Sequence, residues 1–252
     1  MHLKVYNAII YTKLTITSLV FSYDGFDREV LSTKSVNLEV KNFSADFEIP
    51  WGMAFLPDTS MLVTDLSGSL YRVYQDGKKD VIRGMPNVHY KGQGGLLDVE
   101  VHPDFIDNNY IYVSYSQQKK SKAFTAVARA KLIRNHLKDF EIIYDTEYKH
   151  YSRKTVHFGS RFAISGDYLF FSIGDRGERD EAQDLDKPNG KIHRLHLDGR
   201  IPSDNPHKLK NGDVSTVWCY GNRNPQGLAF SKEGVLWESE HGPRGGDELN
   251  II

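Results

Sequence analysis

Three polar residues that follow or precede apolar runs could form a redox or hydrolytic site. His157 lies in the segment VHFGSR, Asp175 in SIGDRG and Arg223 in GNRNPQG. A histidine can act as a general base, a carboxylate can orient it, and an arginine offers a rigid fork of donors for a developing oxyanion. Each residue also has an ordinary structural interpretation, as a buried histidine, a turn former or a surface ion pair. Together the three residues indicate catalysis more strongly than any one of them.

A glycine-rich loop near the end of the sequence could bind a metal ion. Residues 240–250 read EHGPRGGDELN, with three glycines and a proline among charged residues. Gly242 and Pro243 would hold a tight backbone whose carbonyl oxygens can point outward, and Ca²⁺ favours oxygen ligands of this kind. A charged surface turn is the alternative interpretation of the same composition.

Composition narrows the class of protein. The chain has 252 residues, of which 39% are hydrophobic and 26% charged, so it can form a globular core. Its net charge of -1 provides no overall field for binding nucleic acid or an anionic membrane, and neutral small molecules are the expected partners. Cys219 is the single cysteine, which excludes an intrachain disulfide framework. No apolar run reaches the length of a membrane-spanning helix.

The N-terminal segment, residues 1–45, is distinct from the remainder, residues 46–252. It contains the short apolar run LTITSLVF at 14–21, preceded by Lys13. Such a run is consistent with a weak secretory signal, although the lysine interrupts it and no A-x-A pattern follows. An ordinary strand or a disordered lead is the alternative.

Short β-branched and aromatic runs separated by turn residues predict an all-β fold. Expected strands include residues 61–64, 110–115, 168–173 and 235–237. These runs recur after a similar lead-in, and aligning Phe55, Val101, Ile164 and Phe230 gives spacings of 46, 63 and 66 residues. Repeats of this length predict a β-propeller, with a β-sandwich as the alternative. In a propeller, loops from successive blades meet around the central axis, which would bring His157, Asp175 and Arg223 together.

An ordered series of motifs resembles a known family. The segments are IPWGMAFLPD, GQGGLLDVEVHPDF, HFGSRFAI, IGDRG, AQDLDKPNGKIHRL, DGRIPSDNP, GNRNPQGLAF and EHGPRGGDELN. The series is similar to the soluble pyrroloquinoline quinone (PQQ)-dependent sugar dehydrogenases, and most of all to the aldose sugar dehydrogenase branch of the glucose/sorbosone dehydrogenase family. The similarity covers residues 49–252. It implies a six-bladed β-propeller that binds PQQ and Ca²⁺ and lies in the periplasm or outside the cell.

The resemblance also implies an activity and roles for individual residues. Aldoses would be oxidised at the anomeric carbon to lactones, with hydride passing to the quinone and then electrons to an external acceptor. His157 matches the catalytic base, Asp175 the carboxylate that orients it, and Arg223 the cation that stabilises charge on the quinone. The residues that contact the cofactor would be Gln93, His157, Arg223, Asn224 and His241. The carbonyls of Gly242 and Pro243 would bind Ca²⁺.

Family members continue through two further blades, which supply additional cofactor-binding lysine and arginine residues. Only about four repeats are present in this sequence, so we expect an incomplete propeller and negligible PQQ binding by the 252 residues alone. Two other functional classes stay open. One is a non-catalytic or inactive truncated propeller. The other is a calcium-dependent propeller hydrolase or lactonase, which would need carboxylate and asparagine side chains converging on the metal.

Overall fold

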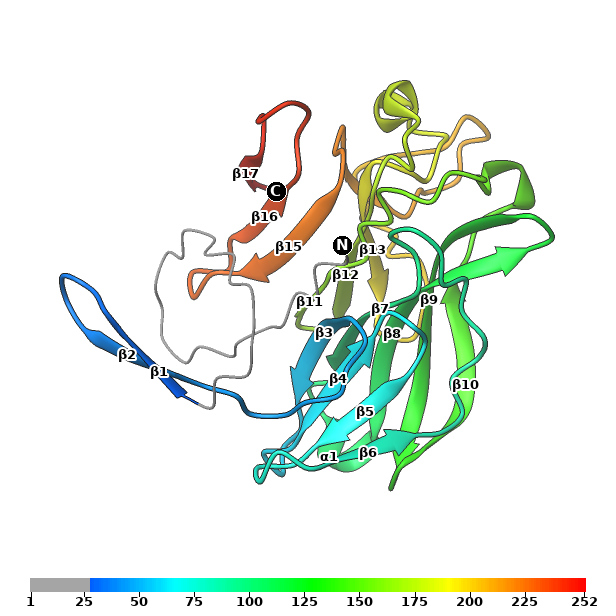
Figure 1. Cartoon of the computed structure of the whole chain (residues 1–252). Coiled ribbons are helices and arrows are strands. Elements are labelled where there is room, and N and C mark those ends of the chain that lie inside the picture. Colours follow the sequence, from blue (N-terminus) through cyan, green and yellow to red (C-terminus); the bar gives the residue numbers. More distant parts are fainter. Residues whose placement is uncertain (1–27) are drawn as a thin grey trace.

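The computed structural model describes residues 28–252 and contains four antiparallel sheets arranged as the blades of a β-propeller (Figure 1). Blade 1 consists of β3 (Pro50–Phe55), β4 (Met61–Asp65), β5 (Leu70–Val73) and β6 (Lys79–Ile82). Blade 2 consists of β7 (Leu96–Val101), β8 (Tyr110–Lys119), β9 (Lys122–Ile133) and β10 (His136–Tyr144). Blade 3 consists of β11 (Phe162–Ser165), β12 (Tyr168–Ile173), β13 (Lys191–His196) and β14 (Val217–Tyr220). Blade 4 consists of β15 (Pro225–Phe230), β16 (Leu236–Glu240) and β17 (Glu248–Ile251).

Each blade is a meander in which consecutive strands pair, and the first strands of successive blades contact one another. The aligned residues Phe55, Val101, Ile164 and Phe230 all lie at or next to the last position of a first strand. The predicted propeller repeat is therefore confirmed. The strands expected at 61–64, 110–115 and 168–173 are present, and the one expected at 235–237 begins at Leu236.

Elements outside the blades are few and short. Helix α1 (Phe105–Asn108) and the 3₁₀ turns η1 (Tyr148–His150) and η2 (Arg179–Gln183) lie in loops between strands. Strands β1 (Arg28–Ser32) and β2 (Asn37–Lys41) form a hairpin that projects away from the blades in Figure 1. The signal-like run at 14–21 lies outside the described residues.

The second strand of a blade has apolar side chains on both faces because each face packs against a different neighbouring blade. In β8, Ile111 packs with blade 1 residues, while the adjacent Tyr112 packs with blade 3 residues. In β12, Phe171 packs toward blade 2 and Phe170 toward blade 4. Successive side chains in a strand point to opposite faces, so two neighbouring apolar residues can belong to two cores. This explains the continuous apolar runs in the sequence.

One guanidinium group joins the inner strands of all four blades. Arg161 immediately precedes β11, and its Nε donates to the carbonyl of Gln226 in β15 at 2.7 Å. Its Nη1 lies 3.3 Å from the Asp98 carboxylate in β7. Its Nη2 donates to the carbonyl of Trp51 in β3 at 3.5 Å, and the guanidinium lies 4.0 Å from the centre of that indole ring. Arg161 therefore crosslinks the blades near the axis.

Replacing Arg161 with methionine is expected to destabilise the fold, because Asp98 would remain as an unpaired carboxylate that is only 7% exposed. Burial already raises the pKa of Asp98, and the Arg161 charge opposes that rise. Removing one partner of a buried ion pair costs about 3–5 kcal/mol, which corresponds to a fall of roughly 10 °C in the melting temperature of a domain of this size. Calorimetry would measure the change. The exposed Arg153→Met is the matched control, and equal melting temperatures for the two variants would contradict the expectation.

Candidate active site

His157 and Asp175 meet because β11 and β12 are antiparallel neighbours. The residues before β11 and those after β12 lie at the same end of blade 3, where the Ser160 amide donates to the Ser172 carbonyl at 2.8 Å. The Nδ1 atom of His157 lies 2.6 Å from Oδ1 of Asp175. A Cβ atom at Gly174 would meet the His157 carbonyl oxygen at 2.3 Å, so this close approach requires glycine.

The hydrogen bond to Asp175 determines the tautomer of His157. In a neutral imidazole, donation from Nδ1 to a carboxylate leaves the lone pair on Nε2. The same Oδ1 atom of Asp175 accepts the Gly177 amide at 2.6 Å, which fixes the carboxylate. The Asp175 side chain is 2% exposed and that of His157 is 16% exposed. The pair therefore combines a buried carboxylate with an imidazole that reaches the surface.

Gln93 connects this pair to the loop between blades 1 and 2. The side-chain Oε1 of Gln93 accepts the backbone N–H of His157 at 2.7 Å, and the backbone N–H of Gln93 donates to the Thr155 carbonyl at 2.8 Å. Gly92, with φ of 62°, packs closely here because a Cβ atom would meet Thr155 Oγ1 at 2.5 Å. The backbone of His157 has φ of 52°, a left-handed conformation that is uncommon outside glycine and that must be held by its surroundings.

Arg223 and Asn224 precede β15 and are anchored by Glu240 at the end of β16. The Glu240 carboxylate accepts the amide of Arg223 at 2.5 Å and that of Asn224 at 3.0 Å, and burial raises the pKa of Glu240. The Arg223 carbonyl accepts the Asp175 amide at 2.7 Å, which joins this loop to the histidine pair. Nη1 of Arg223 donates to the His241 carbonyl at 2.7 Å, and the His241 amide donates to the Asn224 carbonyl at 3.2 Å.

The loop between β16 and β17 contains Gly242 and Pro243. The Gly242 amide donates to Oδ1 of Asp247 at 3.0 Å, and the Pro243 carbonyl accepts the Gly246 amide at 3.1 Å. A Cβ atom at Gly242 would meet the Gly246 carbonyl oxygen at 1.5 Å, so only glycine fits this turn. Carbonyl oxygens keep a second lone pair after one hydrogen bond. The Pro243 carbonyl and the Asp247 carboxylate of this loop are oxygen donors of the kind that Ca²⁺ prefers.

Hydrogen bonds link six of the residues expected at the site into one network, and Gly242 and Pro243 follow the last of them in the chain. Gln93, His157, Asp175, Arg223 and His241 form its continuous chain of contacts, with Asn224 beside Arg223 and the 242–243 turn beside His241. Sequence reasoning missed Glu240. The sequence feature that could have indicated Glu240 is the alternation of this strand. Leu236, Glu238 and Glu240 occupy every second position and are buried, which places a glutamate on the inward face.

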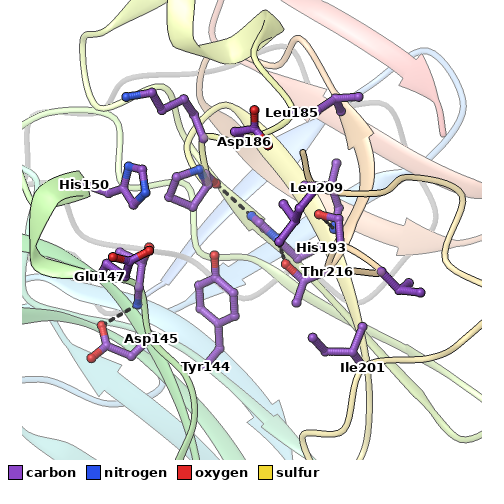
Figure 2. A pocket seen from close by; sticks show the side chains of 16 residues that line it. Tyr144, Asp145, Glu147, His150, Leu185, Asp186, His193, Ile201, Leu209 and Thr216 are labelled. Atoms are coloured by element: carbon purple, nitrogen blue, oxygen red, sulfur yellow. Dashed lines mark hydrogen bonds between the residues drawn. The ribbon is translucent and has the colours of Figure 1, made fainter. Parts of the chain in front are cut away.

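A cavity of about 230 Å³ lies at a different place, between the end of β10 and the loops of blade 3 (Figure 2). In its wall, His193 pairs through Nδ1 with Thr216 Oγ1 and through Nε2 with the Pro188 carbonyl, both at 2.8 Å. Burial lowers the pKa of His193 to about 3, so the imidazole is neutral. Because both ring nitrogens are occupied, His193 is a structural residue. None of the expected site residues lines this cavity.

Residues 28–252 contain no group of three or more histidine, cysteine, aspartate or glutamate side chains placed to hold a metal ion. None of the helices in the same range is long and apolar enough to cross a membrane.

The chain belongs to the glucose/sorbosone dehydrogenase family, which matches residues 47–252. The motif resemblance is therefore confirmed at the level of the family.

Relatives of known name support this assignment. The aldose sugar dehydrogenase YliI of Escherichia coli is 42% identical over an alignment of 224 residues, and the alignment covers 86% of this chain and 59% of the relative. The quinoprotein glucose dehydrogenase B of Acinetobacter calcoaceticus is 32% identical and covers 87% of this chain and 51% of its own length. The structure of the PQQ-bound aldose sugar dehydrogenase from Streptomyces coelicolor superposes with a TM-score of 0.75 at 27% identity, covering 89% of this chain and 63% of that chain. The chain thus spans little more than half the length of these curated relatives.

Proposed function

We propose that the protein is a PQQ- and Ca²⁺-dependent dehydrogenase that oxidises aldoses at the anomeric carbon to lactones. The observation that carries this proposal is the 2.6 Å contact between His157 Nδ1 and the buried Asp175 carboxylate, which leaves Nε2 as a base. The Arg223 loop lies directly beside this pair through the Asp175 amide. Membership of the family and the names of its relatives support a sugar as the substrate.

In the proposed reaction, Nε2 of His157 takes the proton of the anomeric hydroxyl while the anomeric carbon loses a hydride and becomes the lactone carbonyl carbon. The imidazole becomes positively charged in this step. Asp175, already hydrogen-bonded to Nδ1, stabilises that charge and prevents the ring from rotating. The buried position of the carboxylate strengthens this interaction because little water screens it.

When bound, PQQ with its Ca²⁺ supplies the two-electron acceptor for the hydride. Arg223 would place its positive charge beside the cofactor, with its guanidinium fixed by the bond from Nη1 to the His241 carbonyl. The other residues that would hold the two groups are Gln93, Asn224 and His241 for PQQ, and the Gly242 and Pro243 carbonyls for Ca²⁺.

The cofactor assignment can be tested by titrating PQQ into a chain extended to the length of the relatives, with and without Ca²⁺. We expect binding and aldose-dependent reduction of an artificial acceptor only when Ca²⁺ is present, and loss of both on chelation. Arg223→Met is expected to weaken PQQ binding by about 10- to 100-fold, because a charge-assisted contact is worth about 1.5–3 kcal/mol.

Arg244→Met is the matched control, since Arg244 is an exposed arginine in the neighbouring 241–247 loop. Equal PQQ affinity in the two variants would remove Arg223 from the cofactor site. Binding that is indifferent to Ca²⁺ would contradict the metal assignment.

The resemblance further supports a periplasmic or secreted location and an external electron acceptor that reoxidises the cofactor. Both belong to the proposal. Separating cell fractions with antibody detection would test the location, and recovery of the protein only with cytoplasmic markers would contradict it.

A further inference from the structure

Arg176 binds the segment that carries His157, and the mechanism above does not use it. Its Nη1 donates to the Val156 carbonyl, and its Nη2 donates to the Lys154 carbonyl at 2.6 Å. The guanidinium also lies 3.4 Å from the centre of the Phe158 ring. Arg176 is only 1% exposed. One buried side chain therefore contacts the residues on both sides of the histidine.

The segment 154–158 is held along two edges. Carbonyls two residues apart point the same way in an extended chain, which is why one planar fork can bind those of residues 154 and 156. The intervening carbonyl of Thr155 instead accepts the Gln93 amide, and the Gln93 side chain binds the His157 amide. Arg176 and Gln93 thus fix alternate peptide groups, and together they hold the left-handed backbone of His157.

Arg176 also follows Asp175 directly, so adjacent side chains bind the imidazole and the backbone that carries it. The Asp175 carbonyl is itself held by Asn189 Nδ2 at 2.9 Å. A buried guanidinium is costly, and burial lowers the pKa of Arg176 to about 9 against the opposing effect of the neighbouring Asp175 charge. Its two amino groups bind backbone carbonyls and not a carboxylate. The Arg176 guanidinium therefore fixes the position of the 154–158 segment.

We propose that Arg176 is a positioning residue for His157, which holds the histidine's flanking backbone so that Nδ1 stays on the Asp175 carboxylate. In terms of mechanism, this inference rests on the proposed role of His157 as the base. Its immediate claim concerns the hydrogen bond between His157 and Asp175, which can be observed without cofactor or substrate.

The test is proton NMR of the 252-residue chain, following the strongly downfield Nδ1–H resonance of His157 and its exchange with water. His157→Gln assigns the signal. In Arg176→Met the resonance is expected to disappear. In Arg176→Lys, which keeps the charge but lacks the planar fork, the proton is expected to exchange about tenfold faster than in the parent chain. Arg179→Met is the matched control, because Arg179 is an exposed arginine of the same loop, and its spectrum should be unchanged.

An unchanged resonance and exchange rate in folded Arg176→Met would overturn the inference. Circular dichroism checks that each variant folds. If Arg176→Met does not fold, an unchanged resonance and exchange rate in Arg176→Lys would overturn the inference. In the extended, reconstituted enzyme, Arg176→Lys is expected to lower kcat about tenfold without changing the KM for the aldose. If the NMR effects appear but His157→Ala retains full turnover, the proposed function fails while the positioning role of Arg176 stands.

Discussion

Replacing His157 with alanine is expected to lower kcat for aldose oxidation by about 10²- to 10⁴-fold, the usual contribution of a positioned general base. The structure explains the size of the effect. Nδ1 is committed to Asp175 at 2.6 Å, so Nε2 is the ring nitrogen available for a proton, and the ring is held in one orientation. Alanine removes the base and leaves a buried carboxylate without its main partner.

The measurement is steady-state turnover with an artificial electron acceptor, using the extended chain reconstituted with PQQ and Ca²⁺. PQQ affinity should be measured on the same samples, so that loss of chemistry is separated from loss of cofactor. His136→Ala provides the control, because His136 is an exposed histidine at the start of β10. Turnover that survives in His157→Ala with cofactor bound would refute the assigned base.

Two replacements of Asp175 are expected to separate orientation from charge. Asp175→Asn should lower kcat by about 10- to 30-fold, because the amide oxygen can still accept from Gly177 and His157 but no longer stabilises the imidazolium with a full charge. Asp175→Ala should lower kcat by about 10²- to 10³-fold, because the imidazole then loses both the charge and the acceptor that fixes its tautomer.

Comparison of the two variants at equal PQQ saturation makes the test specific. Asp186→Asn is a control for the substitution itself, since Asp186 is a carboxylate that pairs with Lys210 away from His157. Equal activity of the asparagine and alanine variants would mean that charge alone matters. The asparagine amide could also flip and present its NH₂ group to His157, which would force the other tautomer of the imidazole. In that case the downfield Nδ1–H resonance would be lost, and this loss distinguishes a wrong tautomer from a lost charge.

The order of the motifs was enough to predict much of the site. Gln93, His157, Asp175 and Arg223 lie far apart in the sequence, yet each follows or precedes a recurring strand. In a propeller such positions converge, and the structure joins these residues through hydrogen bonds of 2.6–2.7 Å. The repeat itself was visible because each blade buries its strands in the same pattern.

The residues that support the site could not be predicted in this way. Glu240, Arg161 and Arg176 are charged residues that a linear pattern assigns to the surface, whereas the structure buries Glu240 and Arg176 and places Arg161 at the junction of four blades. Their partners are mostly backbone amides and carbonyls. Every residue has a backbone carbonyl, and nearly every one has a backbone amide. The sequence therefore does not indicate which of these groups the three charged side chains bind.

The sequence by itself determined the β-propeller repeat, the family and the chemical identity of the histidine, carboxylate and arginine, because these depend on the order of side-chain types along the chain. Tertiary structure alone decided which nitrogen of His157 remains free, which carboxylate anchors the Arg223 loop, and which cation holds the histidine segment. These depend on hydrogen bonds between residues that lie far apart in the sequence, and such contacts form only when the strands of a blade pair and bring their flanking loops together.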